Sequence, residues 1–501
     1  MKLPKSFYNW TSLAGTTIAL ISLFMILFLF IISLIYRESS SYLGLVIYIV
    51  LPVFLIIGLL IIPIGMTRKH RREKRGEVTK ERRWPIFDFN EQRIRNGFTV
   101  FTIGSTLFLL LSAMGSYEAF HYTESVKFCG TLCHSVMKPE YTAYQNSAHA
   151  RVACVDCHVG AGANWYVRSK LSGLYQVYAT TFNTYPRPIP TPIKSLRPAR
   201  ETCEECHWPQ KFYAHQLVKK VHYLADENNT EWTMGLMLKI GPEHSSLGLL
   251  EGIHWHINPD VTIEYVSTST DRETIPWVRY TNKKTGKTVI YEDSENPLQP
   301  GQMDTLEVRT MDCMDCHNRP SHDYNIPITF INDAITSGKI PKELPDIKFL
   351  SMDLLYHKDF STEDSAMLIL DKEVRAYYEM MYPEILESKG GLIDQAVTGM
   401  QEEFKKNIFP EMKVTWKAYV NHLSHVESNG CFRCHNDRHT SSTDGSVISR
   451  DCDNCHLILS QGTADNMQSS VNGESLEFFH QNDKKQAWKE KFCSECHREL
   501  Y

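Results

Sequence analysis

Cys154-Val155-Asp156-Cys157-His158 is a pentapeptide whose pattern, CxxCH, recurs through the chain and sets its organisation. The pattern occurs six times, and a seventh copy has one extra residue between its two cysteines. The extended copy is Cys129, Cys133 and His134. The regular copies are Cys154, Cys157 and His158; Cys203, Cys206 and His207; Cys313, Cys316 and His317; Cys431, Cys434 and His435; Cys452, Cys455 and His456; and Cys493, Cys496 and His497. Together the seven copies contain all 14 cysteines of the 501 residues, so no thiol is left over.

Paired cysteines followed by a histidine are typical of covalent haem attachment. The two thiols can form thioethers with the two vinyl groups of one haem, and the histidine becomes an axial ligand of the iron. Disulfides and zinc sites are the alternative uses of paired cysteines, but neither requires a histidine after every second cysteine. We therefore predict seven c-type haems with the seven motif histidines as proximal ligands, and no cysteine nucleophile.

Three apolar segments precede the first motif, at residues 11–36, 42–66 and 97–120. About 20 apolar residues cross a bilayer as a helix, so each segment is long enough. The first segment has too long an apolar core for a cleaved signal peptide, and no A-x-A site follows it. Residues 1–120 are thus predicted to be a membrane anchor with three transmembrane helices.

Charge predicts the orientation of this anchor. The loop at residues 67–96 is basic, with nine Lys and Arg against three Glu in residues 68–83. Basic loops stay in the cytoplasm, so the N-terminus is expected inside and every motif outside. Haem is attached outside the cytoplasm, which agrees with this topology. The sequence therefore predicts a protein of the bacterial inner membrane with periplasmic haem domains.

The external part is acidic. Residues 98–501 carry 39 Lys and Arg against 52 Asp and Glu. Such a surface is a poor nucleic-acid binder and favours a basic partner.

Motif spacing and residue patterns divide the external part. Residues 121–215 contain the first three motifs. Residues 216–306 are predicted to be a small β-rich insert, because alternating or β-branched runs occur at 252–258, 261–268, 275–280 and 288–291. Residues 307–325 hold the fourth motif, and 326–430 are predicted to be a helical connector, with a helix-start pattern at Ser361-Thr362-Glu363-Asp364. Residues 431–501 hold three motifs, too short a segment for a core of its own, so haems would form that core with little regular structure around them. The predicted fold class is a membrane-anchored multihaem cytochrome c, mostly helical or irregular outside the membrane.

Each haem iron needs a second axial ligand, and an iron without one keeps an open coordination position where a substrate can bind. His422 and His425 are three residues apart in a predicted helix, and His254 and His256 alternate in a predicted strand, so each pair is expected to share a face. Met137 is a further candidate, whose thioether would raise the potential of the first haem. The distal histidine candidates are His149, His222, His254, His256, His322, His422, His425, His439 and His480.

The run at residues 121–159 resembles the NapC/NirT/NrfH family of membrane-anchored quinol dehydrogenases. The shared features are Tyr-Thr-Glu-Ser at 122–125, the methionine after the first motif, Ser-x-His ending at His149, and the second motif. The layout is similar to the heptahaem inner-membrane cytochromes of that family, which feed menaquinol electrons to periplasmic carriers. The first motif departs from the family pattern, because the family usually has CxxCH followed by His-x-Met. Met137 therefore lies one residue further from its motif histidine than the methionine of the family does.

The resemblance implies a quinol site beside the first haem. Lys170 falls where the family has a lysine that approaches the quinol. The family's aspartate seven residues further on is absent, since position 177 is Val. Proton acceptance is then expected from Glu124, from His121 or from a haem propionate. An interfacial lysine that contacts phospholipid is the alternative role for Lys170.

These observations predict a menaquinol-oxidising heptahaem cytochrome that passes electrons to periplasmic or extracellular acceptors, such as periplasmic cytochromes or a partner reductase. Two alternatives stay open. One is a non-catalytic electron-transfer subunit of a larger respiratory complex. The other is a terminal multihaem reductase of nitrogen or sulfur oxyanions, which would need a five-coordinate haem.

Overall fold

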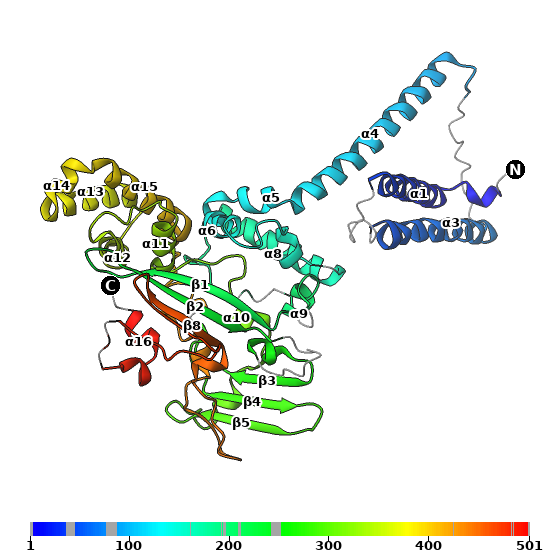
Figure 1. Cartoon of the computed structure of the whole chain (residues 1–501). Coiled ribbons are helices and arrows are strands. Elements are labelled where there is room, and N and C mark those ends of the chain that lie inside the picture. Colours follow the sequence, from blue (N-terminus) through cyan, green and yellow to red (C-terminus); the bar gives the residue numbers. More distant parts are fainter. Residues whose placement is uncertain are drawn as a thin grey trace. The chain divides into compact units, whose positions relative to one another are not determined.

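The computed structural model describes the chain in two compact units (Figure 1). One unit comprises Met1–Cys129 and Cys154–Tyr175, and the other comprises Gly130–Ala153 and Gln176–Tyr501. The structure describes all residues except 1–3, 37–45, 77–87, 161, 192, 194–196, 209–211, 242–251, 424, 482, 484 and 499–501.

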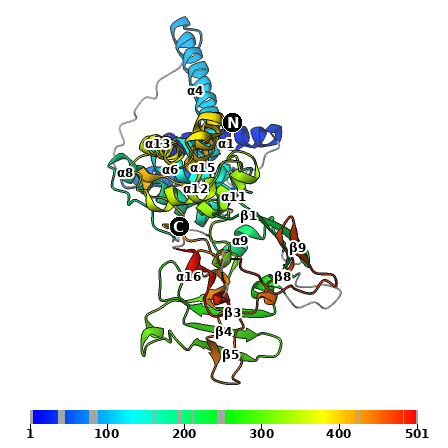
Figure 2. The ribbon, with the colours of Figure 1, turned by 60° about the vertical axis from the view of Figure 1, so that its left-hand side comes forward.

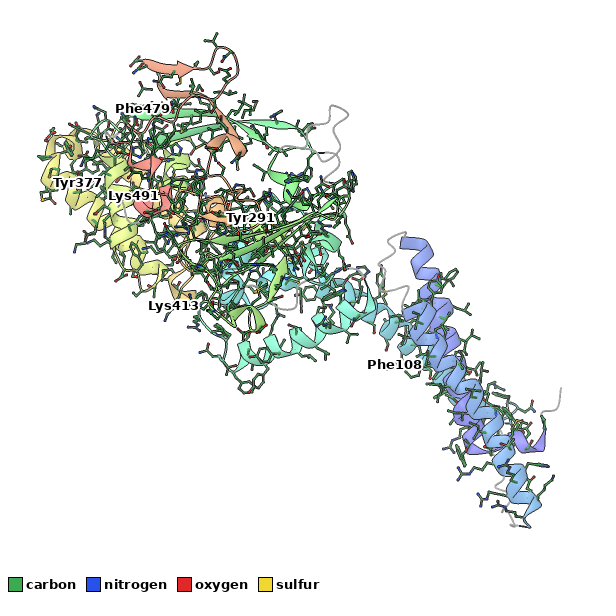
Figure 3. All side chains as sticks on the ribbon, turned by 90° about the horizontal axis from the view of Figure 1, so that it is seen from below. Phe108, Tyr291, Tyr377, Lys413, Phe479 and Lys491 are labelled. Carbon is green, nitrogen blue, oxygen red and sulfur yellow. The ribbon has the colours of Figure 1, made fainter. Side chains whose placement is uncertain are left out.

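Among the described residues, three helices are long and apolar enough to cross a membrane, which agrees with the three predicted spans. They are α1 (Trp10–Tyr36), α3 (Leu51–Lys74, preceded by a π-helical turn at Val46–Val50) and α4 (Gln92–Glu124). α3 continues eight residues past the predicted span, so part of the basic loop is helical. Basic side chains in its last turn face the negative end of the helix dipole, which stabilises that extension. Apolar side chains such as Phe108, 69% exposed, stand off α4 (Figure 3).

Short helices carry the first three motifs. They are α5 (Val126–Thr131), α6 (His134–Gln145), α7 (Cys154–His158) and α9 (Ala199–Cys203), and α8 (Ala163–Thr181) follows the second motif.

The first sheet is antiparallel, with the order β1-β2-β8-β9. Its strands are β1 (His215–Tyr223), β2 (Glu231–Lys239), β8 (His456–Thr463) and β9 (Asn466–Ser469). β8 begins at a motif histidine and pairs with β2, with His456 opposite Leu238. On its other edge β8 pairs with β9 (Figure 2). The expectation of little regular structure in residues 431–501 is therefore wrong.

The second sheet has the order β6-β3-β4-β5-β7. Its strands are β6 (Val308–Thr310), β3 (Val261–Val266), β4 (Trp277–Asn282), β5 (Thr288–Asp293) and β7 (His439–Ser441). The strands expected between residues 261 and 291 are confirmed. The run at 252–258 was expected to be a strand but forms a 3₁₀ turn at Ile253–Ile257. The amide of Asn258 bonds to the carbonyl of Trp255, so this hydrogen bond forms within the turn and not with a neighbouring strand.

Helices form the largest buried core of the second unit. They are α11 (Pro327–Thr336), α12 (Ile347–His357), α13 (Glu363–Met381), α14 (Pro383–Ser388) and α15 (Gly390–Asn407). Thr362 caps α13 through the amide of Ser365, as the sequence pattern indicated. Regular α-helix ends at Asn407 within the connector, so the prediction that His422 and His425 share a helix face is wrong. Their residues lie in a turn and a bend.

Candidate haem ligand pairs and membrane-proximal site

A single helical or hydrogen-bonded turn builds each regular motif. α10 (Cys313–Cys316) and α16 (Cys493–His497) are examples, and a 3₁₀ turn at Gly430–Arg433 is another. One turn brings residues three apart to the same side, so both thiols of a motif can reach one porphyrin edge. The amide of His317 bonds to the carbonyl of Cys313 at 2.8 Å, which holds the histidine at the end of the turn.

Among the described residues, five motif histidines each face a second histidine that lies outside their own motif. The rings are paired as His149 with His207, His254 with His317, His256 with His435, His425 with His456, and His480 with His497. Their centroids are 5.9, 6.3, 5.9, 6.2 and 5.9 Å apart, respectively. A metal–imidazole bond is about 2 Å long and the nitrogen lies about 1 Å from the centroid, so an iron between two imidazoles separates the centroids by about 6 Å. The residues therefore fit bis-histidine haem iron.

Hydrogen bonds at Nδ1 orient several of these rings. Nδ1 lies 3.0 Å from the Pro320 carbonyl in His149, 3.2 Å from that of Ile240 in His254, and 2.7 Å from that of Ile253 in His256. A carbonyl can only accept, so Nδ1 carries the proton and Nε2 keeps its lone pair for a metal. Burial lowers the pKa of His254, which also favours the neutral, ligating form.

His322 shows the same hydrogen bond as these ligand candidates. Its Nδ1 lies 3.0 Å from the Glu140 carbonyl and 3.1 Å from a Glu140 carboxylate oxygen. Met137 lies one turn after His134 on α6 and is half-buried.

Three other candidates have their ring nitrogens occupied differently. Asn332 donates to Nδ1 of His222, so the proton of that neutral ring is on Nε2. Nε2 of His422 donates to the Asp271 carbonyl at 2.9 Å while Arg433 donates to its Nδ1 at 3.2 Å. Both nitrogens of His439 lie within 2.9 Å of protein oxygens, on Asn436 and Ile275. In this geometry none of the three directs a lone pair at iron.

Cysteines of successive motifs meet in pairs, which the spacing of the motifs did not indicate. The side chains of Cys129 and Cys154 lie close together, as do those of Cys203 and Cys313 and those of Cys431 and Cys455. The fourth motif, isolated in sequence, thus lies against the third.

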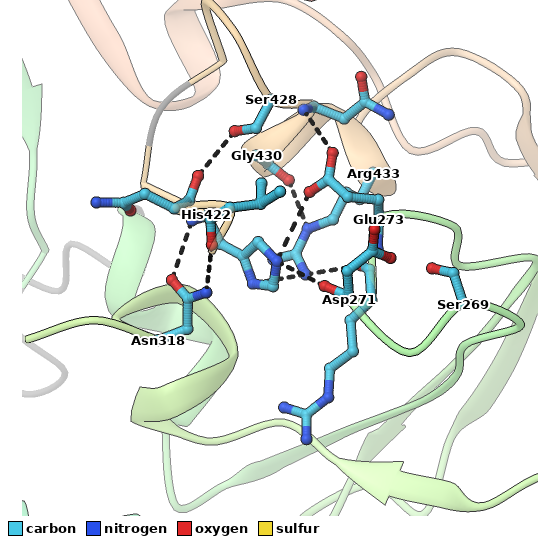
Figure 4. Close-up of polar contacts among 12 residues, drawn as sticks. Ser269, Asp271, Glu273, Asn318, His422, Ser428, Gly430 and Arg433 are labelled. Atoms are coloured by element: carbon cyan, nitrogen blue, oxygen red, sulfur yellow. Dashed lines mark hydrogen bonds and ion pairs between the residues drawn. The ribbon is translucent and has the colours of Figure 1, made fainter. Parts of the chain in front are cut away.

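A buried polar cluster links the fourth motif to the fifth (Figure 4). Arg433, inside the fifth motif, donates from Nη2 to the carbonyl of Asp315, inside the fourth, at 2.8 Å. The Asp315 carboxylate is 1% exposed and accepts from Tyr265 and Arg309 at 2.6 and 2.8 Å. Sequence reasoning missed this cluster, because Arg433 bonds to a backbone carbonyl, a contact that no residue pattern signals.

A charged group lies at the end of α4 in the first unit. Lys170 Nζ is 3.9 Å from Glu124 Oε1 and 5.0 Å from the centroid of the Tyr166 ring. The same carboxylate oxygen is buried, with no hydrogen-bond partner among the described residues. The ring of His121 packs 4.4 Å from that of Tyr117. Lys170 and Glu124 both lie close enough to Cys129 to act on its charge, so this group adjoins the first motif.

Comparison with known proteins gives three results. A model of the N-terminal region of the NapC/NirT cytochrome c family matches residues 91–188. The chain is 40% identical over 491 residues to the cytochrome c-type protein ImcH of Geobacter sulfurreducens, covering 98% of this chain and 95% of that protein. It is 31% identical over 117 residues to the cytochrome c-type protein NrfH of Wolinella succinogenes, 23% of this chain and 64% of NrfH. No solved structure matches.

The family match covers α4, the first two motifs and Lys170, while the longer relative covers almost the whole chain. The three apolar helices account for membrane attachment, and the cysteine motifs account for covalent haem. The chain therefore belongs to the NapC/NirT family of cytochromes c, as a membrane-anchored multihaem member of the inner membrane.

Proposed function

We propose that this protein oxidises menaquinol at the outer face of the inner membrane and delivers its electrons to periplasmic or extracellular acceptors. The observation that carries the proposal is the meeting of Lys170 and Glu124 beside Cys129, where a membrane-crossing helix ends. Seven covalently bound haems, one for each motif, would supply one-electron transfer over the length of the chain.

Lys170 and Glu124 have complementary roles in this proposal. The Lys170 ammonium can donate a hydrogen bond to a quinol oxygen, which orients the ring and favours negative charge developing on that oxygen. The buried Glu124 carboxylate oxygen, without a hydrogen-bond partner among the described residues, can accept a quinol proton. His121, one helical turn earlier, is placed to receive it. Oxidation of one quinol releases two protons and two electrons, so both must leave the site in each turnover.

The histidine pairs support an electron-transfer role for the remaining motifs. We assign His149, His254, His256, His425 and His480 as distal ligands of the third to seventh haems, in that order. Two imidazoles on an iron leave it no open position, which suits electron transfer rather than substrate chemistry. His322 and Met137 remain candidates for the first two haems.

Quinol oxidation is tested with the purified, haem-loaded protein in lipid nanodiscs. A reduced menaquinone analogue is added and haem reduction is followed by its absorbance. We expect Lys170→Leu to slow reduction about tenfold, the loss of one charge-assisted hydrogen bond of about 1.5 kcal/mol.

The matched control is Arg168→Leu on the same helix, because Arg168 stacks on Trp165 and is not part of the Glu124 contact. Its rate should stay near that of the wild type. Equal rates for all three proteins would show that Lys170 does not serve the quinol, and no reduction of the wild type would remove the quinol proposal altogether.

A further inference from the structure

Two histidines on one short turn face two different motifs. In the 3₁₀ turn Ile253–Ile257, His254 lies against His317 of the fourth motif, with ring planes only 4° apart. His256 lies against His435 of the fifth motif, with the rings at 77°. A 3₁₀ helix has about three residues per turn, so residues two apart point in different directions. A strand would have sent both rings to one side.

The turn is fixed to the end of β2. The amide of His254 bonds to the carbonyl of Ile240 at 3.2 Å, and its Nδ1 bonds to the same oxygen. Gly252, which precedes the turn, has φ +137°, and a Cβ there would lie 2.6 Å from Cα of Gly241. Only glycine permits this close approach, so the backbone sets the direction of both imidazoles.

Independent contacts hold the two motifs together. Arg433 Nη2 bonds to the Asp315 carbonyl, and Arg433 Nη1 bonds to His422, whose own amide bonds to Asn318 just after the fourth motif. Tyr265 of β3 donates to the Asp315 carboxylate, and Cys434 packs against the hydrophobic cluster that contains Tyr265. The two attachment sites therefore pack against the same part of the second sheet, around Tyr265.

We propose that the turn Ile253–Ile257 is a double ligand element, in which His254 binds the iron of the fourth haem and His256 binds that of the fifth. These two haems are then immediate neighbours, and they form the junction between the first four haems and the last three. The inference rests on the proposed function in two respects, that the motifs carry haem and that His254 and His256 are distal ligands, and it does not depend on the quinol site. With the cysteine contacts between motifs three and four and between five and six, it orders haems three to six as they occur in the sequence.

The ligand assignment is tested with His254→Ala, His256→Ala and the double variant of the full-length protein. Haem content is measured first, by the pyridine haemochrome, and the oxidised proteins are then examined by low-temperature EPR. We expect the same haem content in each protein, one more high-spin haem than the wild type in each single variant and two more in the double variant.

His439→Ala is the matched control, since His439 is a buried histidine four residues after His435 whose nitrogens are both held by protein oxygens. Its EPR spectrum should match that of the wild type. Spectra of both turn variants that show no added high-spin signal at full haem content would overturn the assignment. If a variant fails to retain haem, His254→Met and His256→Met replace it, and each should show one thioether-ligated haem of raised potential.

The junction is tested by stopped-flow reduction with the menaquinone analogue and, separately, with dithionite. In His254→Met the wild-type extent of reduction should be reached with dithionite. With the quinol, the first haems should still be reduced at the wild-type rate and the last three at least tenfold more slowly. Unslowed reduction of the last three would overturn the junction, whereas no quinol reduction of the wild type would fault only the quinol site.

Discussion

Asp315 shows how strongly one buried side chain can contribute to the stability of this protein. Its carboxylate accepts from Arg272 at 2.9 Å and Arg309 at 2.8 Å while being 1% exposed. Asp315→Asn would leave two guanidinium groups without their counter-charge, so we expect a loss of about 3 kcal/mol in the free energy of unfolding. Urea denaturation followed by circular dichroism measures it.

The control for this change is Asp371→Asn, which breaks an exposed pair with Arg375 on α13. Exposed pairs contribute about 0.5 kcal/mol, so its unfolding curve should nearly match the wild type. Equal losses for both variants would show that burial of the Asp315 contacts does not matter.

Lys348 is a second residue whose burial has a measurable consequence. It is 0% exposed in the α12 core, its Nζ has no hydrogen-bond partner among the described residues, and burial lowers its pKa to about 7. Above that pH the folded protein holds the neutral amine, while the unfolded chain keeps its proton up to pH about 10.4. The unfolded state thus binds more protons, and stability should rise between pH 7 and pH 9, by up to about 1.4 kcal/mol per unit.

Lys348→Met should remove this rise and stabilise the protein at pH 7. Urea denaturation of both proteins at pH 7 and 9 measures the effect, and an equal pH slope in the two would contradict the shifted pKa.

At the scale of elements, α1 and α3 pack through small residues. A Cβ added to Gly58 of α3 would lie 2.7 Å from the amide of Ala19 and 2.8 Å from the carbonyl of Gly15. Close backbone approach of this kind holds membrane helices together. Gly58→Val should therefore separate the two helices and lower the thermal midpoint of the anchor in detergent. Gly104→Val in α4 should not, because no atom lies within 4 Å of a Cβ there. Equal midpoints for the two variants would contradict this packing.

The elements also show what local sequence could and could not predict. The apolar segments and the capping pattern at Thr362 were sufficient to predict their helices, because these signals lie within the element itself. The alternation around His254 indicated a strand. The segment forms a 3₁₀ turn instead, because Gly252 has a positive φ and His254 bonds to the carbonyl of Ile240. β8 could not be foreseen, because its partner β2 is more than 200 residues away.

At the scale of the whole molecule, the residues of the candidate site fall into two groups. The positions of some are set by neighbouring residues in the sequence, and those of others are set by contacts between separate segments. The proposed attachment cysteines and proximal histidines follow from covalent haem chemistry within five or six residues, so the sequence alone is enough to predict them. The proposed distal ligands depend instead on contacts between segments that are separated in the sequence. His149 and His480 were among the candidates, but only the fold separates them from His422 and His439, whose nitrogens are used elsewhere.

The acidic external part leads to a prediction about the electron acceptor. Residues 98–501 carry 39 basic and 52 acidic side chains, and haem propionates would add further negative charge. A basic soluble cytochrome should be attracted over long range, and salt screens that attraction as the Debye length falls from about 30 Å at 0.01 M to about 8 Å at 0.15 M. We therefore expect the second-order rate of electron transfer to such a cytochrome, measured by stopped flow, to fall about tenfold over this range. An acidic soluble cytochrome should instead react slowly at low salt and faster as salt is added. Rates that do not change with salt for either acceptor would show that the partner docks without using this charge.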